Sequence, residues 1–205
     1  MIKGYGTDIG FKVATDMQQV WGGHGYIVEN GMEQFVRDAR IAQIYEGTNG
    51  IQALDLVARK LPANGGRALR TFLAMVDEEV ASASGEAVSA VAERLGKAVG
   101  ELKAAALWLM QNAAADPDQA GAAAYHTMTL TGLVAVGLMW LRMAKAAAEA
   151  LAHGQGAEDA GFYEAKLVTA RHFATTILPE AGALRRKIEA GAETLMALPA
   201  EAFGS

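Results

Sequence analysis

The chain has 205 residues, of which 52% are hydrophobic, and its formal net charge is −5. A chain of this length and apolarity can bury a sizeable core, which excludes general disorder, and its acidic balance gives no basic surplus to meet a nucleic-acid backbone. The sequence contains no cysteine, so disulfides, thiolate metal sites and cysteine nucleophiles are all excluded.

The first predicted helix runs from Thr7 to Trp21. Four apolar residues recur within it at spacings of four, four and three: Ile9, Val13, Met17 and Val20. This spacing is typical of one apolar helix face. The residues before Thr7 lack the apolar stretch of a signal peptide, so we expect a cytoplasmic protein.

A glycine-rich turn and a short helix come next. The run from Gly22 to Gly25 holds three glycines, which stop the first helix and serve either as a turn or as a place where a ligand approaches the backbone. Asn30, with Glu33 three positions later, predicts a capped helix that ends near Arg40, with Glu33 and Arg37 paired. The residues expected to face inward on this helix are Phe35, Val36 and Ala39.

The segment from Arg40 to Gln52 is the strongest candidate for an active site. Glu46 stands between Tyr45 and Gly47, in a stretch that also contains three isoleucines, Ile41, Ile44 and Ile51. An apolar setting raises the pKa of a carboxylate toward neutrality and makes it a usable base. An ordinary loop with an exposed glutamate is the alternative interpretation of this segment alone.

A new helix is predicted to begin directly after Glu46. Thr48 or Asn49 is the expected N-cap, and with Asn49 in that role Gln52 falls at the third helical position. The free backbone N–H groups of this helix start could then hold an anion or a polarised oxygen. Its apolar face ends before Pro62.

The rest of the chain reads as a helical bundle. A boundary is predicted at Pro62 to Gly66, followed by helices at 67–81, 85–115, 118–153, 159–178 and 180–194, with breaks at 82–84, Asp116-Pro117, Gly154-Gln155-Gly156 and Pro179. Short links between helices favour antiparallel neighbours. We therefore predict an all-α protein, with one unit at 1–62 and an up-and-down bundle at 67–205.

Residues 120–141 are long and apolar enough to span a bilayer. Threonines and glycines dilute their apolarity, and Arg142 and Lys145 continue the helical pattern without a break. We therefore expect a buried central helix, surrounded by 67–81, 85–115 and 159–178, and no membrane span.

Other kinds of site lack their sequence patterns. The four histidines never lie four positions apart and no His-Glu-x-x-His occurs, so no metal site is predicted. The phosphate-binding loop, the Gly-x-Ser-x-Gly elbow and the strand that a dinucleotide-binding glycine turn requires are also missing.

Three segments, in this order and spacing, resemble the end of the flavin-dependent acyl-CoA dehydrogenases. They are Gln19-Val20-Trp21-Gly22-Gly23-His24-Gly25-Tyr26, Phe35-Val36-Arg37-Asp38-Ala39-Arg40, and Ile44-Tyr45-Glu46-Gly47-Thr48-Asn49 with Ile51-Gln52. The resemblance covers about Lys3 to Leu61. The bundle after it is similar, less specifically, to the extra C-terminal helical domain of the larger members, which include enzymes acting on long-chain or methylmercaptopropionyl thioesters.

The resemblance implies a role for each matching residue. Glu46 would be the base that removes the α-proton of an acyl-CoA while the β-hydrogen passes as hydride to FAD, and its own N–H would help to hold the thioester oxygen. Tyr45 and Gly47 would line the substrate site. The residues implied to contact FAD are Gln19, Gly22, Gly23, Thr48 and Asn49; Arg37 and Asp38 would be structural.

The resemblance also implies partners and a missing part. An acyl-CoA would be the substrate, electron-transfer flavoprotein the acceptor, and a homodimer or higher homo-oligomer the assembly. In this family a helical domain and a β domain precede the matching region, so we expect a fragment with little activity by itself and with exposed helix faces that self-associate. A non-catalytic helical association module and an unrelated bundle are the alternatives.

Overall fold

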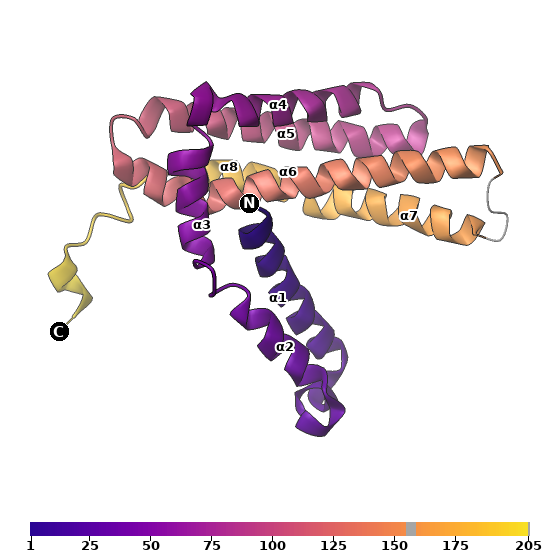
Figure 1. Cartoon of the computed structure of the whole chain (residues 1–205), viewed down its shortest axis with the longest axis horizontal. Helices are drawn as coiled ribbons and strands as arrows, with labels where there is room; N and C mark the ends of the chain where they lie inside the picture. The colour runs from indigo at the N-terminus through magenta and orange to yellow at the C-terminus, as the bar shows by residue number, and fades with distance from the viewer. Residues whose placement is uncertain (155–158, 205) are drawn as a thin grey trace.

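The computed structural model describes residues 1–154 and 159–204, and those residues form helices and connecting loops without a strand. Figure 1 shows the helices. Their bounds are α1 Ile2–Val20, α2 Met32–Ile41, α3 Asn49–Asp55, α4 Ala63–Ala81, α5 Glu86–Asn112, α6 Pro117–Ala152, α7 Ala160–His172 and α8 Glu180–Glu189. Two π-helical turns, Leu56–Lys60 and Phe173–Ile177, extend α3 and α7. The all-α prediction is confirmed.

Helix α6 is the centre of the bundle. It packs against α5, α7 and α8 along its length, and α3 and α1 cross it near its first half. Its largest fully buried side chains are Met128, Leu130, Leu133, Val134, Leu138 and Leu141. α6 is long and apolar enough for a bilayer, but 61% of the 18-residue apolar window that meets this criterion is buried inside the protein. The predicted buried central helix is confirmed, although the prediction did not include α8 among its neighbours.

Local chemistry fixes the start of α6 as predicted. The Asp116 carboxylate accepts the backbone N–H of Asp118 at 3.0 Å, and Pro117 occupies the first helical position, where no N–H is needed. The Gln119 amide donates to the other Asp116 oxygen at 3.0 Å. Its carbonyl oxygen accepts the N–H of Ala192, which holds the chain just after α8.

The predicted break at Pro62 to Gly66 is present, whereas one helix end differs from the prediction. Asn64, Gly65 and Gly66 are all left-handed and form a sharp turn, which glycine permits at two of the three positions. Helix α8 ends at Glu189, not near residue 194, because Gly191 is left-handed and stops it. The predicted break at Gly154-Gln155-Gly156 lies partly outside the described residues.

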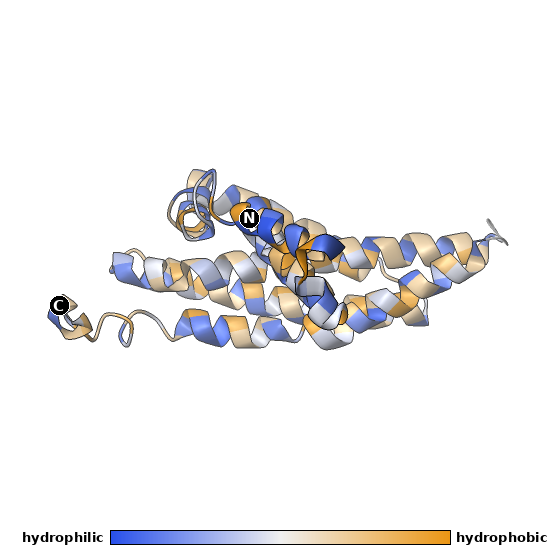
Figure 2. Cartoon of the chain, turned by 90° about the horizontal axis from the view of Figure 1, so that it is seen from below, coloured by the Kyte–Doolittle hydropathy of each residue, from blue (hydrophilic) through white to orange (hydrophobic). Residues whose placement is uncertain are grey.

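Helices α1 and α2 form a hairpin that projects away from the bundle (Figure 1). In Figure 2 the hairpin points towards the viewer, across the long axis of the bundle. Only the first turns of α1 contact α6. At that crossing each helix offers a glycine to a large side chain of the other: Gly4 faces Met128, and Gly132 faces the Tyr5 ring. These close approaches anchor the hairpin.

The projecting hairpin leaves predicted inward faces exposed. All four residues of the apolar α1 face are exposed, as is Phe35 on α2, whereas Val36 and Ala39 are half-buried. The inward prediction was wrong for Phe35, because no described element covers that side of the hairpin. Glu33 and Arg37 do pair, at 3.9 Å. Asn30 is not the cap of α2; Gly31 holds that position, and the Asn30 amide donates to the His24 carbonyl.

Candidate active site

The loop from Ala42 to Thr48 joins α2 to α3 and carries Glu46. Its ends are closed by backbone hydrogen bonds from Tyr45 N–H to the Ile41 carbonyl and from Asn49 N–H to the Gln43 carbonyl. Between them Glu46 and Gly47 are left-handed, with φ of 55° and 82°. A left-handed residue other than glycine is uncommon and costs about 1–3 kcal/mol, so surrounding contacts must hold it.

Two side chains hold the loop at this strained point. The Gln52 amide donates to the Glu46 carbonyl at 2.9 Å, and the Lys3 ammonium donates to the Gly47 carbonyl at 2.8 Å. A Cβ at Gly47 would lie 3.0 Å from the Gln52 amide nitrogen. The left-handed φ and this close approach together favour glycine after Glu46. The backbone around Glu46 is therefore fixed from two sides.

The Glu46 side chain itself is exposed in this chain. The apolar setting predicted from Ile41, Ile44 and Ile51 is not formed, because these three side chains are also exposed. The loop lies at the outer side of the hairpin base, where no other described element covers it. That part of the prediction is wrong for the chain taken alone.

The start of α3 differs from one of the two predicted caps. Thr48 is the N-cap, and its hydroxyl accepts the N–H of Ile51 at 3.5 Å. Asn49 lies inside the helix and is only 4% exposed. Gln52 bonds the Glu46 carbonyl and makes no capping box. With seven residues, α3 is too short for its N-terminus to serve as an anion site on its own.

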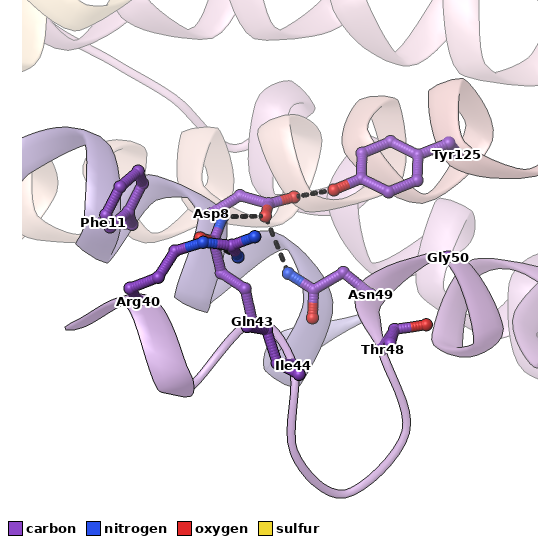
Figure 3. Close-up of a pocket in the computed structure, with 9 residues that line it drawn as sticks. All are labelled: Asp8, Phe11, Arg40, Gln43, Ile44, Thr48, Asn49, Gly50 and Tyr125. Carbon is purple, nitrogen blue, oxygen red and sulfur yellow. Dashed lines mark hydrogen bonds between the residues drawn. The ribbon is translucent and has the colours of Figure 1, made fainter. Parts of the chain in front are cut away.

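Asn49 and Asp8 form a polar cluster beneath the loop. The Asn49 amide nitrogen donates to the Gly4 carbonyl, the Thr7 hydroxyl and the Asp8 carboxylate, and its oxygen accepts from Lys3 at 2.7 Å. Figure 3 shows Asp8 at the centre, with hydrogen bonds from three labelled residues. They are Asn49 and Gln43 at 2.7 Å and the Tyr125 hydroxyl at 2.6 Å.

These residues border an open hollow of about 500 Å³. Its rim is completed by Phe11, Arg40, Ile44, Thr48 and Gly50. Arg40 lies 5.8 Å from the centre of the Phe11 ring and donates to Gln43 at 3.0 Å. The lining of the hollow is thus mixed, with Phe11 and Ile44 as its apolar side chains and polar groups among the rest.

Sequence reasoning missed Lys3, Thr7, Asp8 and Tyr125. Lys3, Thr7 and Asp8 recur at helical spacing on a face of α1 opposite to its apolar stripe, which was a usable signal. Tyr125 gave none, because it stood in a segment interpreted only by its apolarity. Partners separated by more than 100 positions are not visible in local patterns.

The structure does not bring together all of the residues predicted to contact FAD. Thr48 and Asn49 lie at the base of the hairpin, whereas Gln19, Gly22 and Gly23 lie at its tip (Figure 1). Thr7 contacts Asn49, and the twelve helical residues from there to Gln19 span about 18 Å. The five residues therefore form two separate groups.

Steric contacts separate the roles of the glycines in the turn. A Cβ at Gly25 would lie 2.7 Å from the Gln18 carbonyl oxygen, so Gly25 is explained by turn packing. Gly22 is left-handed, and neither Gly22 nor Gly23 has an atom within 4 Å of an added Cβ. The backbone at these two glycines is open to the approach of a ligand. Among the described residues no cluster of His, Asp or Glu is suited to a metal ion.

Two family models match the chain. "Acyl-CoA dehydrogenase, C-terminal domain" matches residues 1–61, and "Acetyl-CoA dehydrogenase C-terminal like" matches residues 72–199. Together with the helical fold, these matches assign the chain to a family of helical C-terminal regions from thioester-oxidising enzymes. The chain belongs to the acyl-CoA dehydrogenase family. The unrelated-bundle alternative is thereby excluded.

Two curated relatives match nearly the whole chain, and a third matches about a quarter of it. It is 39% identical over 198 residues to 3-methylmercaptopropionyl-CoA dehydrogenase of Ruegeria pomeroyi, covering 96% of this chain and 33% of that protein. It is 32% identical over 213 residues to a broad-specificity linear acyl-CoA dehydrogenase of Mycobacterium tuberculosis, covering 99% of this chain and 34% of that protein. An acyl-CoA dehydrogenase of Bacillus subtilis is 46% identical over 54 residues. The chain spans about a third of the length of the first two relatives.

Proposed function

We propose that this chain acts as the C-terminal part of an FAD-dependent acyl-CoA dehydrogenase that converts acyl-CoA thioesters to 2-enoyl-CoA. Glu46 is the base that takes the α-proton. The observation that carries the proposal is the left-handed Glu46–Gly47 backbone, fixed by Lys3 and Gln52, while the Glu46 carboxylate has no hydrogen bond or ion pair within residues 1–154 and 159–204. A fixed backbone with an unpaired carboxylate is the arrangement that a positioned base requires.

The chain's other residues support binding at two places. FAD, when bound, would supply the hydride acceptor. Gly22 and Gly23 leave open backbone for it at the hairpin tip, and the Thr48 hydroxyl keeps its proton to donate. The side-chain nitrogen of Asn49 already has three intrachain partners, so this residue is better suited to hold the loop than to contact a flavin directly.

In the proposed enzyme the substrate lies over the exposed side of the loop. Tyr45 and Gly47 flank Glu46 there, and Tyr45 is half-exposed. A bound thioester would cover Ile44 and Ile51 and give the carboxylate the apolar surroundings that the chain alone does not provide. The same proposal includes electron-transfer flavoprotein as the electron acceptor, a homo-oligomeric assembly and a cytoplasmic location. It also includes the division of the chain into two units, 1–62 and 67–205.

The experiment replaces Glu46 by Gln in a full-length acyl-CoA dehydrogenase that contains this chain. Gln is nearly isosteric but cannot accept the proton, so the rate of flavin bleaching by acyl-CoA should fall by at least ~10²- to 10⁴-fold while FAD stays bound. Glu164→Gln, at an exposed position of α7 away from both proposed binding places, is the control and should bleach at the wild-type rate. Rapid bleaching in the Glu46→Gln protein would refute the assignment.

A non-catalytic association module is the second candidate. The observation that favours it is the exposed apolar stripe of α1, formed by Ile9, Val13, Met17 and Val20. Such a stripe on a projecting helix is typical of a surface that packs against another helix. Reduction of one equivalent of bound flavin by acyl-CoA would rule this candidate out.

A further inference from the structure

The Tyr125–Asp8 hydrogen bond connects the second bundle to the Glu46 loop. Among the described residues it is the only side-chain hydrogen bond that joins residues 1–62 to the bundle that follows. At the crossing of α1 and α6 two close contacts accompany it, Gly4 with Met128 and Gly132 with the Tyr5 ring. Unlike these packing contacts, the hydrogen bond requires its donor and acceptor to be aligned, so it also constrains the orientation of the Asp8 carboxylate.

At the crossing of α1 and α6, Tyr125 and Asp8 lie on the two helix faces that meet. Tyr125, Met128 and Gly132 stand at i, i+3 and i+7 on α6, which puts them on one face. Gly4 and Asp8 stand at i and i+4 on α1 and face it. The two glycine contacts bring the backbones close together, and the tyrosine then reaches the carboxylate at 2.6 Å.

Asp8 connects Tyr125 to both ends of the Glu46 loop by hydrogen bonds. One of its oxygens accepts from Gln43, where the loop begins, and from Asn49, where it ends, each at 2.7 Å. The other oxygen accepts from Tyr125. The carboxylate therefore cannot turn towards Tyr125 or away from it without disturbing both loop ends.

Tyr125 is a suitable donor for such a permanent contact. Burial, and then the hydrogen bond to Asp8, raise the pKa of its hydroxyl to about 12. The hydroxyl is thus protonated, and able to donate, at every pH at which an enzyme of this kind is handled.

We propose that Tyr125, which belongs to the second bundle, is a positioning residue that holds the Glu46 loop in its working geometry through Asp8. This inference rests on the proposed role of Glu46 and gives the second bundle a part in the reaction. In the described part of the chain Tyr125 donates its side-chain hydrogen bond to Asp8 and makes none to Glu46, so it acts on the loop through the cluster.

The first test measures the loop itself in the 205-residue chain. Tyr125→Phe removes only the hydroxyl. The backbone amide hydrogen of Asn49 should then exchange roughly three- to tenfold faster, which is the change in the opening equilibrium that the loss of one hydrogen bond produces. Asp8→Asn should quicken it at least as much, because it also disturbs the bonds from Gln43 and Asn49. The double variant should exchange no faster than Asp8→Asn, since Tyr125→Phe acts only through Asp8. Tyr163→Phe is the control, since its hydroxyl makes no hydrogen bond in the described part of the chain.

The second test uses the full-length enzyme described above. There Tyr125→Phe should lower kcat while KM changes little, because misplacement of the base affects the transition state more than substrate binding. Unchanged exchange at Asn49, or exchange quickened equally throughout α5 and α6, overturns the inference. Quickened loop exchange with unchanged kcat also overturns it. Failure of the proposed function is a different result: Glu46→Gln would then bleach normally, whatever the loop exchange shows.

Discussion

The crossing of α1 over α6 predicts an unusual effect of Gly132→Ala. In most helix interiors this change gains about 1 kcal/mol, because alanine favours the helix. Here the new Cβ would lie 2.3 Å from Tyr5 Cγ and 2.7 Å from Tyr5 Cβ. Rotation of the ring cannot relieve the second contact, since that atom is fixed to the α1 backbone. Overpacking of this kind costs about 1–3 kcal/mol, and displacing Tyr5 forfeits a further ~1.5–3 kcal/mol of burial.

After the helix gain is subtracted, the expected net loss is about 1.5–5 kcal/mol in the free energy of unfolding, measured by urea denaturation with helical circular dichroism. Gly121→Ala is the matched control on the same helix: no atom lies within 4 Å of its new Cβ, so it should stabilise by up to about 1 kcal/mol. In a Tyr5→Gly background, which removes the Tyr5 Cβ as well as the ring, Gly132→Ala should become neutral or stabilising. Equal, favourable effects at positions 121 and 132 would refute the packing account.

Two further predictions concern the bundle. Leu138→Asp should cost several kcal/mol of stability, because Leu138 is 1% exposed and the charge would be buried without a partner. Met139→Asp, at the 43% exposed neighbour, should cost less than about 1 kcal/mol. Similar midpoints of the two variants in thermal denaturation would contradict this. Hydrogen bonds from Lys145 and then Arg142 lower the pKa of Glu79, so its stabilising contribution should be complete above about pH 4.5 and be lost as the pH falls through the lowered value. Wild-type protein should therefore exceed Glu79→Gln in stability near neutral pH and converge with it in acid, with Glu78→Gln as the control; a constant difference between pH 7 and 3 would oppose the assignment.

Strong local signals predicted most of the fold. Asp116-Pro117 with Gln119 predicted the start of α6, and the apolar run from 120 to 141 predicted a central buried helix. These predictions succeeded because capping and burial depend on residues close together in the sequence or on total apolarity. The helices after residue 67 were predicted from the same kinds of local signal.

The candidate site was predicted less completely. Sequence reasoning selected the Glu46 loop, but it could not show that Lys3, Asp8 and Tyr125 support that loop, because those contacts span from about 40 to more than 100 positions. It also placed Glu46 in an apolar setting on the basis of isoleucines that the chain leaves exposed. Periodicity shows which residues share a face, but what covers the face depends on tertiary structure.

The paired glycine contacts between α1 and α6 also bear on the order of folding. Tyr5 and Gly132 are separated by 127 positions, from 5 to 132, whereas α4, α5 and α6 contact one another as sequence neighbours. Closing the longer loop costs more chain entropy and is rewarded only once the α6 surface exists. The bundle is therefore expected to form first and to act as the template on which the hairpin docks. Ordering of the Glu46 loop then reports completion of folding, and its release is the first step when the protein begins to unfold.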